Sequence, residues 1–228
     1  MTISSSRRGL LLPIAGVAVF AVLAGCGGGS AAPAAAPQPS SSAAGSAATP
    51  GGTSPSPSPS TVDAGQSPVP VENNPPGDIP DNLAFVRYRN PAGGYGFTFP
   101  EGWARSERGT AVTFISKLDG IAADSAGVPA NLGVAAVRAQ EVPRLRRTQP
   151  AFELRTVEAV SLPAGQGVRV VYRRNSAPDP VTGRQVRDEV ESYLVASSAK
   201  RVRLDLFGPV GADNVDAYRT ISQSLVLS

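Results

Sequence analysis

The chain changes composition abruptly near residue 80, and this change limits which part of it can fold. Residues 27–80 contain no Lys, Arg or aromatic residue and consist mainly of Ala, Pro, Ser and Gly. A segment with so little apolar surface does not offset the entropy that it loses on ordering. By contrast, 12 of the 13 aromatic residues lie in residues 81–228. We therefore expect residues 26–80 to form a disordered tether and residues 81–228 to form the folded domain.

Residues 1–25 have the layout of a secretory signal peptide. Two arginines, Arg7 and Arg8, precede an apolar run over residues 10–22, which is short for a membrane-spanning helix. The run leads into a tetrapeptide that ends in the only Cys of the chain: Leu23, Ala24, Gly25 and Cys26. This tetrapeptide resembles the lipobox of bacterial lipoproteins, in which the residue matching Cys26 receives a diacylglycerol group and becomes the mature amino end.

The lipobox resemblance implies a chain anchored in the cell membrane, on its extracytoplasmic face, with the lipid bilayer as a partner through Cys26. An ordinary secretory signal with an incidental Cys is the alternative. The paired arginines also resemble a twin-arginine export signal, so the export route stays open. The tether is either a plain spacer with a reach of about 40 Å or an O-glycosylated stalk.

The composition excludes several kinds of chemistry. The chain has no His and one Cys, so Ser-His-Asp and Cys-His catalysis, internal disulfides and thiolate zinc sites are all ruled out. We expect no cofactor and no metal site. The domain carries 19 Lys and Arg against 15 Asp and Glu, a balance too even to predict nucleic-acid binding.

Hydrophobicity inside the domain alternates mostly with a period of two, which is typical of half-buried strands. Short connections with Pro, Gly, Asn and Ser favour antiparallel hairpins between them. The strands predicted in this way cover residues 83–90, 95–99, 111–116, 131–139, 156–162, 167–174, 185–197 and 201–207.

One helix is predicted near the end of the domain. Asp213 or Asn214 can cap a helix that runs to about Ser224, with one stripe that faces the sheet: Val215, Tyr218, Ser222 and Leu225. A second helix is less well indicated because prolines at 143 and 150 interrupt the Arg-rich stretch between them. The sum is an α+β domain with a largely antiparallel sheet flanked by helices.

Four stretches of the domain carry a resemblance to a known family. Residues 88–91 followed by 95–103, which read YGFTFPEGW, look like the opening of PsbP-like domains, and residues 208–218 look like their end. Residues 178–183 and 211–216 resemble a group of lipoproteins from high-GC Gram-positive (actinobacterial) bacteria. The resemblance implies an antiparallel sheet sandwiched by helices and used for binding or assembly rather than catalysis.

Acidic residues provide two candidate sites. Asp188, Glu189 and Glu191 form the densest acidic group, and paired carboxylates are what glycoside hydrolysis needs. On a strand, however, Glu189 and Glu191 share one face and Asp188 points to the other, so a solvated face neutralised by nearby arginines is favoured. Acids at 213–216 lack the ligand spacing of a Ca²⁺ loop, and helix capping accounts for them better.

Two further features are candidate binding residues. Arg144, Arg146 and Arg147 form a basic cluster suited to anionic lipid headgroups, wall polymer or an acidic partner, although solvated loop charge is the simpler interpretation. Trp103 offers a flat ring for carbohydrate stacking, whereas a lone aromatic residue beside a strand usually packs in the core.

These observations predict a non-enzymatic lipoprotein whose domain binds an envelope protein or polymer outside the cytoplasmic membrane. The alternative is an envelope glycan-binding module or a hydrolase that uses carboxylates on one sheet face. A solute-binding component of a transporter is less favoured because 148 residues are few for two lobes that close on a ligand.

Overall fold

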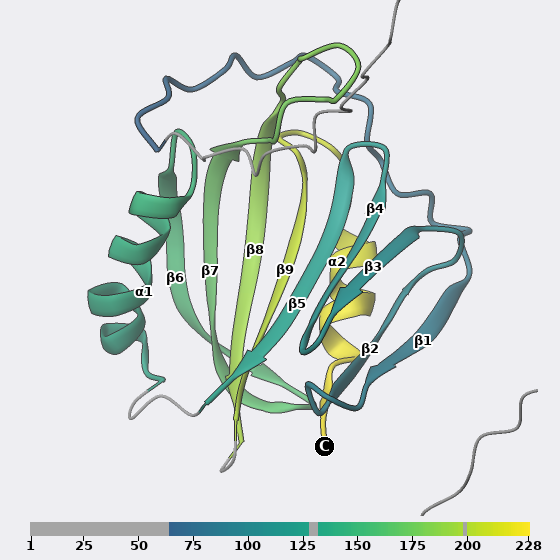
Figure 1. The fold of residues 1–228 in the computed structure, drawn as a ribbon, viewed down its shortest axis with the longest axis vertical. Coiled ribbons are helices and arrows are strands. Elements are labelled where there is room, and N and C mark those ends of the chain that lie inside the picture. Colours follow the sequence, from purple (N-terminus) through teal and green to yellow (C-terminus); the bar gives the residue numbers. More distant parts are fainter. Residues whose placement is uncertain (1–63, 128–131, 198–199) are drawn as a thin grey trace, which may run out of the picture. The chain divides into compact units, whose positions relative to one another are not determined.

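The computed structural model describes residues 64–127, 132–197 and 200–228, which fold around two antiparallel sheets. The described residues form a seven-stranded sheet in the order β3 (Ala104–Arg108), β4 (Ala111–Ser116), β5 (Asp119–Ala126), β9 (Arg201–Pro209), β8 (Arg187–Ala196), β7 (Gly165–Asn175) and β6 (Glu153–Leu162). They also form a three-stranded sheet in the order β1 (Phe85–Asn90), β2 (Tyr95–Pro100) and β10 (Val226–Leu227). All strand pairs are antiparallel (Figure 1).

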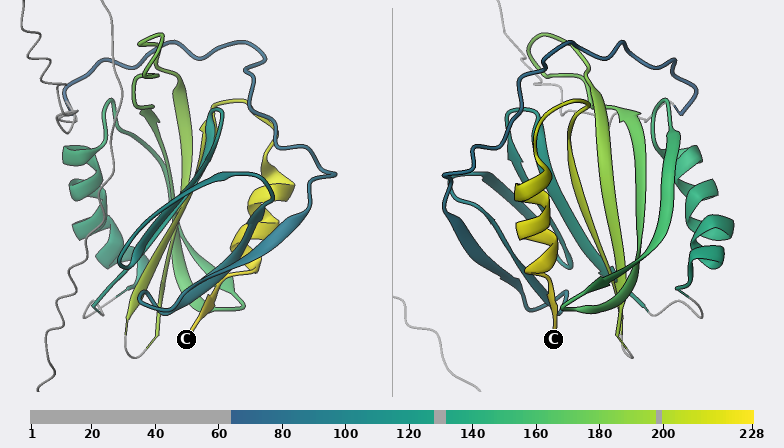
Figure 2. Two further views of the ribbon diagram at one scale, coloured as in Figure 1. Left: turned by 45° about the vertical axis from the view of Figure 1, so that its right-hand side comes forward. Right: turned by 180° about the vertical axis from the view of Figure 1, so that it is seen from behind.

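Two helices, α1 (Val134–Thr148) and α2 (Val215–Gln223), lie on opposite sides of the large sheet (Figure 2). The alternation of side chains along each strand gives the large sheet two apolar faces, and each face has its own core. The predicted α+β class with largely antiparallel sheets is confirmed. In the part of the chain that the structure describes, no helix is long and apolar enough to cross a membrane.

The larger core lies between the small sheet, α2 and one face of the large sheet. Aromatic rings dominate it: Phe97 and Phe99 of β2 meet Phe114 of β4, with ring centroids 5.9 and 4.0 Å apart. Trp103 packs against the same core with 8% of its surface exposed. Aromatic residues occupy every second position at the start of the YGFTFPEGW stretch because the rings of Tyr95, Phe97 and Phe99 pack in this core.

The second core lies between α1 and the other face of the large sheet. Val137 and Leu145 of α1 pack against Val170 and Tyr172 of β7, all of them buried. This helix replaces the strand predicted over residues 131–139. The buried residues of α1 recur at helical spacing from Val137 to Leu145, and their packing on the sheet offsets the hydrogen bond that Pro143 cannot donate.

Helix α2 begins where predicted, and most of its predicted stripe faces the core. Ser222 and Leu225 are buried and Tyr218 packs against the larger core, whereas Val215 at the start of the stripe is 64% exposed. Asn214 occupies the capping position without a side-chain capping bond. Its amide is engaged elsewhere, because it accepts from the backbone N–H of Ile79.

Residues 64–80, here named the strap, belong by their contacts to the domain rather than to the tether in which the sequence placed them. Figure 1 shows the strap crossing the end of the large sheet. Asn175 accepts the N–H of Val69 at 3.0 Å and donates to the carbonyl of Ser67. At the other end Ile79 is buried in the larger core. Composition did not reveal this because the strap is held mainly by polar side chains far along the chain.

Replacing Asn175 with Ala should release the strap. The change leaves the Val69 N–H without its buried partner, which costs about 1–3 kcal/mol. We expect urea denaturation to show a loss of that size and amide exchange of Val69 to accelerate strongly. Asn82→Ala, at an exposed position, is the control and should change stability by less than about 0.5 kcal/mol. Equal effects of the two variants, or continued protection of Val69, would contradict the role of Asn175.

Candidate functional site

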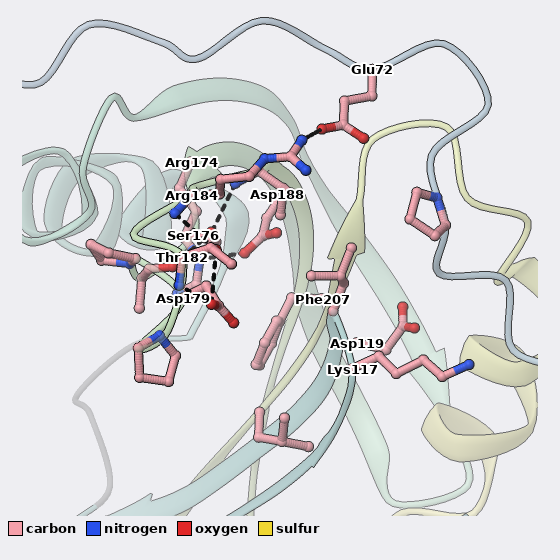
Figure 3. Close-up of a pocket in the computed structure, with 17 residues that line it drawn as sticks. Glu72, Lys117, Asp119, Arg174, Ser176, Asp179, Thr182, Arg184, Asp188 and Phe207 are labelled. Atoms are coloured by element: carbon pink, nitrogen blue, oxygen red, sulfur yellow. Dashed lines mark hydrogen bonds and ion pairs between the residues drawn. The ribbon is translucent and has the colours of Figure 1, made fainter.

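A cavity of about 520 Å³ opens at the end of the large sheet that the strap crosses (Figure 3). Three segments wall it: the β4–β5 turn, the β7–β8 loop over residues 176–186, and the strap through Glu72 and Pro76. Its size is in the range of pockets that hold small molecules. Phe207, Leu118 and Ile115 supply apolar lining, and two carboxyl groups supply the chemistry.

Asp188 at the start of β8 is the more deeply buried of these carboxyl groups, with 2% of its surface exposed. Its Oδ2 lies 3.5 Å from the Nε of Arg174. Its Oδ1 is buried and accepts no hydrogen bond from the described residues. Burial raises the pKa of Asp188 to about 6, against the opposing effect of the Arg174 charge. An unpaired buried carboxylate oxygen is costly, so it favours any ligand that donates a hydrogen bond to it.

Asp119 at the start of β5 is the second carboxyl group. Its Oδ1 accepts a hydrogen bond of 2.8 Å from Nδ2 of Asn214. Burial raises the pKa of Asp119 to about 7, and the nearby charges of Asp188 and Asp78 raise it further. A Cβ at Gly208 would lie 2.3 Å from this Oδ1, so the glycine is what allows the carboxyl group to approach β9.

Two neighbours determine where the Phe207 ring lies in the cavity. The guanidinium of Arg174 lies 4.8 Å from the centre of its ring, a cation–π distance. A Cβ at Gly120 would come within 2.1 Å of the ring, so the absence of a side chain there makes room for it. Arg174 also donates to Gln149, which holds the guanidinium in place.

The β7–β8 loop forms a shaped rim. Asp179 accepts from the N–H of Val181 and from both the N–H and the hydroxyl of Thr182. These hydrogen bonds lower the pKa of Asp179. Arg184 of the same loop pairs with Glu72 of the strap at 2.6 Å. The rim and the strap are therefore joined by an ion pair across the cavity.

The predicted binding residues do not line this cavity. Arg144, Arg146 and Arg147 are exposed on α1, and Arg144 pairs with Glu141. Trp103 is buried in the larger core, so the structure corrects its carbohydrate-stacking interpretation: the ring packs inside rather than facing solvent. The lipobox residues Leu23, Ala24, Gly25 and Cys26 lie outside the described residues.

The acidic group divides as the strand geometry predicted. Glu189 pairs with Arg173 at 3.0 Å and Glu191 with Arg169 at 3.3 Å, on the face opposite Asp188. These ion pairs replace the neutralising partners expected from the sequence, because β7 places Arg173 directly across from Glu189 and Arg169 diagonally across from Glu191. Of these three acids, Asp188, which lies next to Arg174, is the one at the cavity.

Sequence reasoning missed Asp119 and the cavity itself. A signal was present in the two stretches that resemble actinobacterial lipoproteins. Residues 178–183 supply part of the rim, and Asn214 in residues 211–216 donates to Asp119. One stretch thus lines the cavity and the other holds Asp119 in it, a relation that their separation in the sequence concealed. Within the described ranges, no cluster of three carboxylates or thiolates is arranged to hold a metal ion.

Comparison with known proteins gives distant structural similarity alone. No family model matches the chain, and no curated protein matches it. The solution structure of cyanobacterial PsbP (CyanoP) from Synechocystis sp. PCC 6803 is 18% identical with a TM-score of 0.44, over 67% of this chain and 98% of that one. The crystal structure of LpqN, involved in cell envelope biogenesis of Mycobacterium tuberculosis, is 11% identical with a TM-score of 0.43, over 65% and 92%.

A crystal structure from Bacteroides thetaiotaomicron is 13% identical with a TM-score of 0.40, over 62% of this chain. This chain spans about half of that protein, 48% of its length.

The raised pKa of Asp188 predicts a measurable pH dependence of stability. The folded state binds this proton more tightly than the unfolded state, whose pKa is near 3.8, so the contribution of Asp188 to stability is present at low pH and is lost as pH rises from about 4 to about 6. We expect Asp188→Asn to reduce the measured fall in stability by at most about 3 kcal/mol in urea titrations between pH 4 and 7, with the part due to Asp119 remaining. Asp81→Asn, an exposed control, should keep the wild-type slope.

Proposed function

We propose that this chain is a lipid-anchored, extracytoplasmic lipoprotein whose domain is a non-enzymatic binding module for an envelope component or partner protein. The lipobox ending at Cys26 and the tether that follows it support the location. The cavity beside the strap supports binding, and one observation carries it: a buried Asp188 carboxylate with one oxygen unpartnered. The bound component is then held at the end of the sheet where the tether enters the domain.

Binding accounts for this arrangement better than catalysis does. Asp188 is paired with Arg174, and Asp119 accepts from Asn214, so each carboxyl group is committed to a neighbour that fixes it. Both side chains are at least nine-tenths buried. A carboxylate that is held in one position and keeps one unpartnered oxygen suits recognition of a donor group.

A carboxylate-based hydrolase is the second candidate function. The raised pKa values of Asp119 and Asp188 favour it, because an acid near neutral pH is what proton transfer requires. The pair first considered, Glu189 and Glu191, is occupied by arginines. A hydrolase of this kind would lose activity on envelope glycans in Asp188→Asn, whereas the binding module has no such activity to lose.

Lipidation is tested at Cys26. Mass spectrometry of the mature amino end should show a diacylglycerol-modified Cys26 with residues 1–25 removed, since the lipobox places cleavage before the Cys. In fractionation, the protein should move with the membrane, and Cys26→Ser should abolish the modification. Ala24→Ser, which keeps a small residue in the lipobox, is the matched control and should remain modified. An intact Met1, or an unmodified Cys26 at the mature end, would contradict the anchor.

The binding role is tested by photo-crosslinking at the rim. Val181 is 90% exposed in the rim loop, so a photoreactive residue there disturbs no packing. We expect it to capture an envelope component in intact cells, and the capture to fall at least about tenfold in an Asp188→Asn background. The control position is Ser106 on the exposed edge strand β3. Identical products from both positions, or none from either, would count against the cavity as a binding site.

A further inference from the structure

We propose that the cavity binds an amine with an apolar body, its ammonium group donating to the free oxygen of Asp188 and its body lying against Leu118 and Phe207. This inference rests on the proposed function, because it takes the cavity as the binding site and names the chemistry of the ligand. Three features of the cavity support it: a hydrogen-bond acceptor without a partner, an apolar wall, and more carboxyl groups than cationic groups.

The orphan acceptor is Oδ1 of Asp188. The other oxygen is already close to Arg174, at 3.5 Å, so the free oxygen alone remains to be satisfied. In a recess of low polarity, a hydrogen bond between two charged groups is about twice as strong as one between neutral groups. An ammonium group therefore satisfies this oxygen better than a hydroxyl group does.

The charges around the cavity also favour a cation. Four carboxyl groups and three cationic groups line it: Glu72, Asp119, Asp179 and Asp188 against Lys117, Arg174 and Arg184. Arg184 is matched by Glu72, and Lys117 is exposed with a flexible stem that reaches water. Arg174 must serve both the Asp188 carboxylate and the Phe207 ring. The negative charges of Asp119 and Asp188 are therefore only partly balanced by cationic groups, so the cavity disfavours an anionic ligand.

The apolar wall determines the rest of the ligand. Leu118 and Phe207 line the cavity, and Ile115 at its mouth is a large apolar side chain that remains 39% exposed. Covering such surface contributes about 25 cal/mol for each Å² removed from water. A small ammonium ion alone would leave this surface wet, whereas an aralkyl or alkyl amine covers it.

The charge of the carboxyl groups gives the binding a pH dependence. An ammonium group binds the ionised form of Asp188, whose pKa burial raises to about 6, so affinity should fall as pH drops through that value. The other titratable and charged groups that face the two carboxyls come from every neighbouring element: Arg174 of β7, Arg187 of β8, Lys117 of the β4–β5 turn, Asp78 of the strap and Tyr218 of α2.

The test is a calorimetric titration of the full chain in phosphatidylcholine nanodiscs, with empty nanodiscs as the blank. The probes are benzylammonium, benzyl alcohol and benzoate, which share a ring and differ in the head group. We expect benzylammonium to bind at pH 7.5 at least about tenfold more tightly than the other two probes. Its affinity should fall severalfold at pH 5, where the probe keeps its charge.

Two substitutions at adjacent positions localise the binding. Asp188→Asn should weaken benzylammonium at least about tenfold, and Glu189→Gln, on the opposite face of β8, should leave it within twofold. Amide NMR spectra of both variants show whether each is folded. The pH dependence of the wild-type affinity for benzylammonium tests the Asp188 carboxylate without any substitution. Equal binding of benzyl alcohol, tighter binding of benzoate, no binding of any probe, or equal effects of the two variants would overturn the proposal.

The two proposals fail differently. If rim crosslinks at Val181 persist while benzylammonium does not bind, the cavity remains a binding site and the amine class is overturned. If benzylammonium binds through Asp188 while rim crosslinks are absent, the amine class stands and the envelope role is the part that fails.

Discussion

Strand β8 is the constraint on which the structure depends, because it is buried on both faces. Val190 and Leu194 lie under α1, while Tyr193 and Val195 lie in the larger core. A strand in this position must place every second residue in one core or the other. Asp188 lies on the same face of β8 as Val190, so the register of the strand buries its carboxyl group on a face that otherwise packs apolar side chains. The raised pKa and the unpaired oxygen are consequences of that register.

The strands that alternate clearly could be predicted from the sequence, and those that depend on distant partners could not. The range predicted for β4 agrees with the structure because Val112 and Phe114 alternate with smaller residues. All residues of β3 are exposed and most are charged, so the strand carries no alternation to detect. β5 is built largely from small residues, and its pairing with β9, about 80 residues away, is what makes it a strand.

The candidate site was predictable only in fragments. Asp188 was singled out with its acidic neighbours, and the geometry of a strand separated it from Glu189 and Glu191. Its partner Asp119 lies nearly 70 residues earlier in the chain, at the start of a strand with no distinctive pattern. The strap could not be predicted either, because its partners are also distant in the sequence. Its anchors, Asn175 and Asn214, lie 106 and 135 residues beyond the backbone groups that they bind, and local composition carries no trace of such pairings.

The strap also determines how the domain would respond to mechanical load. A pull on the chain before residue 64 meets the contacts of the strap before it reaches β1, among them the Val69–Asn175 hydrogen bond, the Glu72–Arg184 ion pair and, last, the Ile79–Asn214 hydrogen bond. These contacts hold one wall of the cavity. Tension would therefore peel open the cavity wall while both sheets stay intact, and a ligand that bridges the strap and the β7–β8 loop would resist the peeling.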